Sequence, residues 1–211
     1  MKYPWRFYEK SVGMWIVESG RGVHSFPLET KGLDLEGVSR EYFHYFDEAM
    51  AALGERFAPT SIEYPPGETV TESPIPLYLV QAKQRLFEAW REDVKHCDRW
   101  APGAVFRGLS EVAVQVEGKV ISTQLPGILS VMFSGVPGSD RYALALSTNC
   151  DIWLDRTISG EANPVGRANA LRLERSLKKL EEALDGKVVH YATEVEGVKL
   201  SEHGFAYAAG T

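Results

Sequence analysis

The sequence predicts an α+β fold: a mostly antiparallel sheet of five to seven strands with about three helices packed on one face. Strand-like runs in residues 104–154 are joined by short turns, which is the pattern of an antiparallel meander. Two amphipathic helices precede this region and a third follows it. We therefore expect a single α+β domain over residues 1–211. Its parts are a helical portion at 38–100, a strand meander at 104–154, and a final helix and strand at 163–192.

The bulk composition is that of an ordinary globular protein. The 211 residues are 44% hydrophobic and 25% charged, and no apolar run approaches the roughly 18 residues of a membrane helix. The first residues lack the apolar stretch of a secretory signal. Cys97 and Cys150 lie far apart without metal-ligand spacing, which favours reduced thiols. We expect a cytoplasmic protein that needs no cofactor and no metal.

The first predicted elements are a hairpin and a helix. Residues 13–17 and 23–26 flank a Gly-Arg-Gly turn, which indicates two paired strands. The helix that follows carries apolar residues at helical spacing: Phe43, Phe46, Met50, Leu53 and Phe57. Ser39 is expected to cap this helix, and Pro59 is expected to stop it.

The segment 60–76 contains two clusters of proline and is predicted to be a long connection without regular structure. A connection of that length is often a covering or binding loop. A second helix is expected over residues 77–100, because apolar residues again recur at helical spacing. These residues are Leu79, Leu86, Trp90, Val94 and Cys97.

The last third of the chain shows the clearest elements. Glu117-Gly118 is a good two-residue hairpin turn within the meander, and residues 152–154 are expected to add a further strand. The final helix has Asn163 as its expected cap, Pro164 at its first position and Gly186 as its left-handed exit. Its apolar stripe is formed by Leu173, Leu177, Leu180 and Leu184. Residues 187–192 are expected to return to the sheet as a strand.

No recognised catalytic or ligand-binding motif occurs in the chain: there is no GxSxG, Walker A loop, GxGxxG, HExxH, EF-hand or Cys₄ pattern. Cys150 could pair with His190 as a nucleophile, although a thiol at a strand edge is more often packed as a small hydrophobe. The loop 155–163 leads into a helix N-terminus, where anions are favoured, but a plain connection is the simpler interpretation. If the chain holds a small ligand, the candidate residues are Asn149, Asp151, Arg156 and Arg167.

The charge of the chain argues against nucleic acid as a partner. The formal net charge is −6, and the excess of acidic residues falls in 38–100 and 150–211. Because no basic run is available to release counterions from phosphates, we expect no nucleic-acid binding. An acidic surface suits a basic protein partner or simple solubility. The candidate partner-binding residues are Asp47, Glu48, Glu55, Glu88 and Glu92.

In size, acidity, α+β pattern and lack of catalytic motifs, the chain resembles bacterial immunity proteins, which neutralise a toxin by occluding its active site. The resemblance is one of general character and transfers no functional residue. We predict a non-catalytic, cytoplasmic protein-binding protein of the immunity or inhibitor type that occludes a basic partner. One alternative is a small-molecule-binding domain or enzyme with a pocket near residues 149–172, between the sheet and the helices. Another is dimerisation through 111–123 or the exposed side of the meander.

Overall fold

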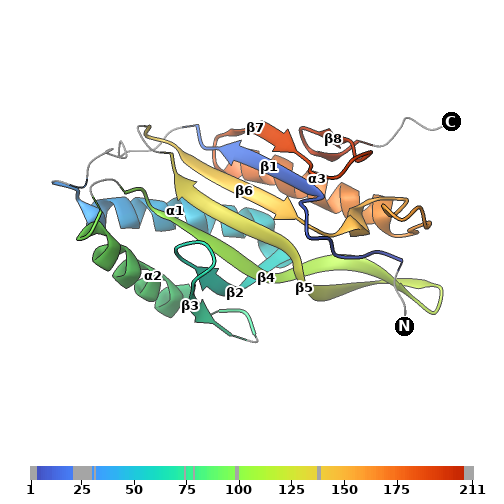
Figure 1. The fold of residues 1–211 in the computed structure, drawn as a ribbon, viewed down its shortest axis with the longest axis horizontal. Coiled ribbons are helices and arrows are strands. Elements are labelled where there is room, and N and C mark those ends of the chain that lie inside the picture. Colours follow the sequence, from blue (N-terminus) through green and yellow to red (C-terminus); the bar gives the residue numbers. More distant parts are fainter. Residues whose placement is uncertain are drawn as a thin grey trace.

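The computed structural model describes residues 4–20, 30, 32–73, 75–77, 79–97, 100–136 and 139–206. These residues form a seven-stranded antiparallel sheet with three helices on one face, as the sequence predicts, and a small two-stranded sheet (Figure 1). The helices are α1 (Leu35–Leu53), α2 (Leu79–Val94) and α3 (Gly166–Ala183). The strands are β1 (Gly13–Glu18), β2 (Phe57–Glu63), β3 (Thr69–Glu72), β4 (Gly103–Val116), β5 (Lys119–Gly135), β6 (Tyr142–Thr148), β7 (Lys187–Ala192), β8 (Leu200–Ser201) and β9 (Gly204–Phe205). None of the described helices combines the length and the apolar character needed to cross a membrane.

The strands of the large sheet follow the order β3-β2-β4-β5-β6-β1-β7. The meander β4-β5-β6 is confirmed, and its first turn places Glu117 and Gly118 at φ 51° and 78°, as a tight two-residue hairpin turn requires. The predicted return of residues 187–192 to the sheet is also confirmed, as β7. The first strand, β1, pairs with β6 and β7. Its predicted partner, 23–26, lies outside the described residues.

An aromatic core joins the helices to the sheet. Tyr42 and Phe46 of α1 pack on Phe133 and Phe106 of the sheet, with ring centroids 4.9 and 4.3 Å apart. The Tyr42 hydroxyl donates to the carbonyl oxygen of Phe133 at 2.9 Å, so its burial leaves no donor unsatisfied. Trp90 of α2 meets the edge of Tyr42 at 4.7 Å. All five side chains are buried, and each contributes about 1.5–3 kcal/mol by leaving water.

The ends of α1 differ from the prediction. The helix begins at Leu35, because the Asp34 carboxylate accepts the backbone N–H of Gly37 at 3.0 Å and caps it there. Ser39, the predicted cap, lies inside the helix and donates its hydroxyl to the carbonyl of Glu36. The helix ends at Gly54, which has φ 56°, well before Pro59. The predicted boundaries were therefore wrong at both ends.

The predicted long loop at 60–76 was also wrong, because β2 and β3 form a hairpin there. Pro59 sits in β2 at a shift of the register against β4, a position where a missing backbone N–H is tolerated. Beyond it, Ile62 is buried while its neighbours Ser61 and Glu63 are half-buried, so the segment has strand periodicity. The proline clusters hid this short alternating pattern.

The connection into α3 corrects two further expectations. Residues 152–154 add no strand, because the 3₁₀ helix η2 (Asp151–Trp153) occupies that position. Asn163 does not cap the helix, which begins at Gly166 without a side-chain cap. Its buried amide instead donates to the carbonyl oxygens of Ile152 and Leu154, at 3.0 and 2.9 Å. Asn163 therefore holds η2 against the loop that precedes α3.

The exit from α3 is built differently from the prediction. The stripe of four leucines on this helix is buried, as expected. The left-handed residue at the exit, however, is Asp185 with φ 46°, and not Gly186. A Cβ at Gly186 would lie 1.9 Å from the carbonyl oxygen of Glu18, so the glycine is required by the close approach of β1.

Candidate functional site

The acidic candidates on α1 are already engaged with basic neighbours. Asp47 forms an ion pair with Lys83 of α2, and Glu48 lies 3.6 Å from the Nε2 atom of His44. The side chain of Glu55 lies outside the described part of the chain. Exposed pairs of this kind contribute little to stability, so these carboxylates remain available to a partner that offers a better cation.

The acidic candidates on α2 lie on its exposed surface. Glu92 accepts from Lys95 at 2.7 Å and lies 3.2 Å from His96, and the Lys95 hydrogen bond is the main cause that lowers its pKa. Glu88 accepts the side-chain amide of Gln84 at 3.0 Å. These contacts are all formed within α2 or with the two residues that follow it, and they bring neither carboxylate toward a common site.

The charge differs from helix to helix. α1 carries one basic and four acidic residues, α2 carries three of each, and α3 carries five basic and three acidic residues. The acidic excess of the helical layer therefore belongs to α1 alone. A basic partner would find a complementary surface on α1 but a repulsive one on α3.

The four ligand candidates near the end of β6 do not surround one cavity. Asn149 is exposed and lines a hollow beside β5 and β6. Asp151 is fully buried. Arg156 is exposed and donates to the carbonyl oxygen of Gly160 in its own loop at 3.0 Å. Arg167 lines a different hollow, beside α3 and β9.

Asp151 fastens two peripheral segments to the fold. Its carboxylate accepts the backbone N–H of Arg6 and the hydroxyl of Tyr8, both at 2.7 Å, and the backbone N–H of Ile158 at 3.0 Å. Burial, followed by this hydrogen bond to Asp151, raises the pKa of Tyr8 well above its usual range. The three donors satisfy the buried carboxylate and tie both the N-terminal segment and the loop after η2 to it.

The face of the sheet opposite the helices carries an unusual row of side chains. Residues that pair across antiparallel strands point to the same face, so the register defines the row. It runs across six strands, from β2 to β7, through Glu63, Val105, Met132, Ala145, Ile16 and His190 in that order. Met132, at its centre, is 42% exposed. Among the described elements, all three helices lie on the other face (Figure 1).

A neighbouring row on the same face borders a polar hollow. Ser130 and Ser147 pair across β5 and β6, and their hydroxyl oxygens lie 2.7 Å apart. They line a hollow of about 310 Å³ together with Arg107 and two carboxylates, Glu9 and Glu194. Because Arg107 forms an ion pair with Glu63 at 2.5 Å, its charge is already balanced. The rim of this hollow is therefore acidic.

The uncovered face leaves a signal in the sequence itself, in strands that are apolar on both sides. In a strand with one covered face, apolar and polar residues alternate. Residues 14–17, Met-Trp-Ile-Val, and residues 131–133, Val-Met-Phe, are instead apolar on both faces. Trp15 and Phe133 point to the helices, which leaves Ile16 and Met132 on the uncovered face.

Cys150 does not have the environment of a nucleophile. The side chain is fully buried, and this burial raises the pKa of its thiol to about 12. A reactive cysteine needs the opposite shift, since the thiolate is the attacking species. His190, its suggested partner, is an exposed residue of β7 that pairs with Ile16. The position indicates a packed thiol.

We expect iodoacetamide at pH 8 to label Cys97 in the folded protein and to leave Cys150 unlabelled. A pKa near 12 leaves a thiolate fraction of about 10⁻⁴ at that pH, and the burial also blocks access. Peptide mass mapping after labelling, with and without urea, measures this. Burial raises the pKa of the Cys150 thiol from 9.0 to about 12, so between these pH values the folded protein keeps a proton that the unfolded chain releases. The free energy of unfolding should therefore fall as the pH rises from 9.0 to about 12. Labelling of Cys150 as fast as Cys97 without urea would contradict the expectation.

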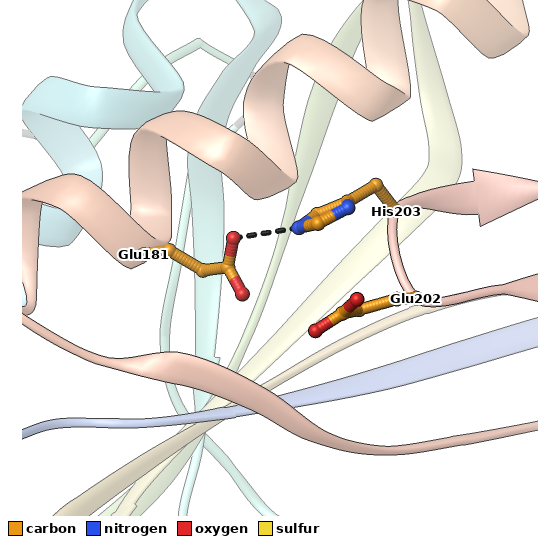
Figure 2. A group of neighbouring side chains, drawn as sticks. All are labelled: Glu181, Glu202 and His203. Carbon is orange, nitrogen blue, oxygen red and sulfur yellow. Dashed lines mark hydrogen bonds and ion pairs between the residues drawn. The ribbon is translucent and has the colours of Figure 1, made fainter.

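A second cluster, which the sequence did not reveal, lies between α3 and the turn that joins β8 to β9. Figure 2 shows the carboxylates of Glu181 and Glu202 and the imidazole of His203 converging, with their potential ligand atoms all within 4.8 Å of one another. The Nε2 atom of His203 lies 2.6 Å from a carboxylate oxygen of Glu181. Only the tertiary fold brings these residues together, since His203 follows Glu181 by 22 residues, across β7 and β8.

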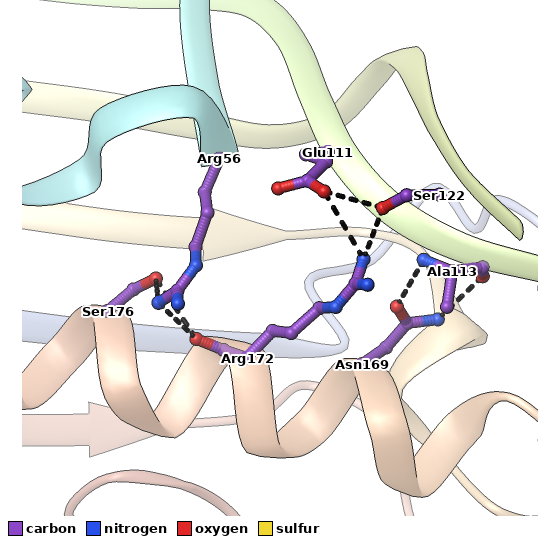
Figure 3. A network of polar contacts seen from close by, with 7 residues as sticks. All are labelled: Arg56, Glu111, Ala113, Ser122, Asn169, Arg172 and Ser176. Carbon is purple, nitrogen blue, oxygen red and sulfur yellow. Dashed lines mark hydrogen bonds and ion pairs between the residues drawn. The ribbon is translucent and has the colours of Figure 1, made fainter.

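A polar network attaches the start of α3 to the long β4-β5 hairpin (Figure 3). The Asn169 side chain accepts the backbone N–H of Ala113 at 2.7 Å and donates to its carbonyl oxygen at 3.0 Å. One turn later, Arg172 donates to the hydroxyl of Ser122 at 3.0 Å and lies 3.9 Å from the carboxylate of Glu111. Asn169 thus completes the hydrogen bonding of a strand edge that β2 does not reach.

Arg56 extends this network from the end of α1. Its guanidinium donates to the carbonyl oxygen of Arg172 and to the hydroxyl of Ser176, at 3.0 and 2.9 Å. Burial, then the neighbouring charge of Arg175, lowers its pKa from the usual value. The contacts of Arg56, Asn169 and Arg172 in Figure 3 join different elements of the scaffold, so we interpret the network as structural.

No family model, curated protein or solved structure matches this sequence.

Proposed function

We propose that the chain is a non-catalytic cytoplasmic protein that binds a protein partner through the uncovered face of its sheet. The observation that carries this proposal is the apolar centre of that face, where Val105, Met132, Ala145 and Ile16 lie side by side in register. An antiparallel sheet with one covered face usually presents polar residues on the other. Apolar side chains gathered on a surface mark an interaction site.

Charges around the apolar centre favour a partner with a basic side chain. Glu9 and Glu194 border the adjacent hollow, while Glu63 balances Arg107. The paired hydroxyls of Ser130 and Ser147 offer further hydrogen-bond acceptors at its wall. A lysine or arginine side chain of the partner that enters the hollow would meet two carboxylates there. Covering the basic surface of a partner in this way is how an inhibitor of the immunity type acts.

Three matched variants test where the partner binds. Met132→Glu places a charge at the apolar centre. Val120→Glu places the same charge at the tip of the β4-β5 hairpin, where Val120 is 58% exposed against 42% for Met132. The double variant Asp47→Asn with Glu48→Gln removes the acidic pair of α1. Each is tagged, purified from the native host and compared with the unchanged chain for the amount of co-purified partner. All the substituted side chains are partly or fully exposed, so folding should be preserved.

We expect Met132→Glu to reduce partner retention at least about tenfold, because one desolvated hot-spot contact contributes 2 kcal/mol or more. The other two variants should retain it. Loss of the partner in the α1 variant alone would place binding on the acidic helix and refute the use of the sheet face. Loss in Val120→Glu alone, with light scattering that shows a dimer, would favour self-association. If the unchanged chain retained equal amounts of partner at low and high salt, the proposed attraction between its carboxylates and a basic partner would be refuted.

The hollow also supports a second function, the binding of a small polar ligand. Its volume of about 310 Å³ lies at the lower end of the range for ligand pockets, and Asn149 reaches it together with the hydroxyl pair. Native mass spectrometry of the purified chain would then show an added mass that Asn149→Leu removes. An unchanged bare mass in both proteins would refute this alternative.

A further inference from the structure

The turn between β8 and β9 carries two potential metal ligands toward α3. Glu202 and His203 are the two residues of this turn, and both side chains point toward Glu181 in Figure 2. The set combines one imidazole nitrogen with two carboxylates. Hard cations such as Ca²⁺ and Mg²⁺ prefer oxygen ligands alone, whereas an imidazole with carboxylates suits Zn²⁺ and its neighbours in the first transition series.

The donor atoms are close enough for a single ion to join them. Around tetrahedral Zn²⁺, with bonds of about 2.0–2.1 Å, neighbouring donors lie roughly 3.3 Å apart. The present donors lie within 4.8 Å, and the closest pair, Glu181 and His203, is 2.6 Å apart. Coordination therefore requires a small opening of that pair and a rotation of Glu202, which is an exposed side chain free to change rotamer.

Contacts outside the cluster hold the side chain of Glu181 and the turn that carries Glu202 and His203. The second oxygen of Glu181 accepts the backbone N–H of Val188 at 2.8 Å, which fixes the plane of the carboxylate. The turn is anchored by Trp15, whose indole donates to the carbonyl oxygen of Ser201 at 3.0 Å and whose ring packs on Phe205. Support of this kind orients metal ligands and strengthens binding.

Water and other ligands can reach the cluster from one side. His203 lines a hollow of about 300 Å³ together with Arg167, Glu174 and Phe205. Its side chain is 25% exposed and that of Glu181 is 18% exposed. Three protein ligands beside an open hollow leave a coordination position for water or for a group from a partner.

We propose that Glu181, Glu202 and His203 form a binding site for a divalent transition-metal ion, with Zn²⁺ as the best match. The imidazole nitrogen of His203 and one oxygen from each carboxylate are the ligands, and the remaining position faces the hollow. The site lies on α3 and the β8-β9 turn, so it is separate from the sheet face proposed for the partner and is tested independently of it.

Calorimetric titration of Zn²⁺ into the chelator-treated full-length chain tests the proposal. We expect saturable binding of one ion per chain and a higher midpoint of thermal unfolding in its presence. Co²⁺ should give visible absorption bands typical of a four- or five-coordinate ion. Glu202→Gln should weaken Zn²⁺ binding at least about tenfold, since even the loss of an outer-sphere partner costs that much. His203→Ala should weaken it further.

Two control variants make the test specific. Glu182→Gln changes the next carboxylate along α3, which lies on the groove between α1 and α3. His96→Ala removes an exposed histidine that pairs with Glu92 on α2. Both should bind Zn²⁺ as the unchanged chain does. The proposal is overturned if the unchanged chain binds no Zn²⁺, if Glu202→Gln and His203→Ala both bind normally, or if either control loses binding.

Discussion

Replacing Asp151 by alanine should lower the free energy of unfolding by about 3–5 kcal/mol, the range found when one partner of a buried charged contact is removed. The carboxylate is fully buried and accepts three hydrogen bonds, from Arg6, Tyr8 and Ile158. Its loss leaves these donors inside the protein without an acceptor, at about 1–3 kcal/mol for each one that water cannot reach. Asp151→Asn should cost less, about 2 kcal/mol, because one amide oxygen can still accept.

Urea unfolding followed by tryptophan fluorescence measures the change. Asp155→Asn is the matched control, since the exposed Asp155 side chain accepts a local N–H, from Arg156, and no other donor among the described residues. It should change stability by no more than about 0.5 kcal/mol. Tyr8→Phe removes a single donor, so a double-mutant cycle with Asp151→Asn should show a coupling of about 1 kcal/mol. An Asp151→Ala protein as stable as the control would mean that the N-terminal segment is not held by this residue.

Most of the fold could be predicted because its signals are local. The four leucines of α3 and the Glu117-Gly118 turn each lie within one element, and both predictions are confirmed. Element ends were harder, since several polar residues could satisfy the same free N–H groups. Ser39 and Asn163 are both good caps by type, yet Asp34 caps α1, and Asn163 bonds to the carbonyl oxygen of Ile152 in η2. Long-range packing decided between these uses.

The candidate sites depended on tertiary contacts that no local pattern contains. Asp47 is a carboxylate with an exposed helical position, but its pairing with Lys83 of another helix is invisible in the sequence. The approach of His203 to Glu181 is equally non-local. The uncovered sheet face is different, because the apolar runs around Ile16 and Met132 already break the alternation expected of a half-covered sheet.

Asn169 should be as important to the fold as a core residue, although its side chain is polar. It is fully buried, and its amide mimics a neighbouring strand by accepting from Ala113 N–H and donating to Ala113 C=O. We expect Asn169→Ala to lower the free energy of unfolding by about 3 kcal/mol, because two buried backbone groups lose their partners at once. Asn169→Asp should cost at least as much, since the carboxylate faces a carbonyl that needs a donor.

The effect should be concentrated in the part of β4 that pairs with β5 but extends beyond its pairing with β2. Hydrogen–deuterium exchange is expected to speed up at residues 111–116 and 119–125 in Asn169→Ala, while the amides of β6 keep their protection. Asn149→Ala is the control, because Asn149 is exposed and should change stability by about 0.5 kcal/mol at most. If exchange became faster uniformly over the sheet, the Asn169 side chain would stabilise the domain as a whole and would not specifically attach the hairpin to α3. Faster exchange confined to residues 111–116 and 119–125 would instead show that Asn169 holds the β4-β5 hairpin against α3.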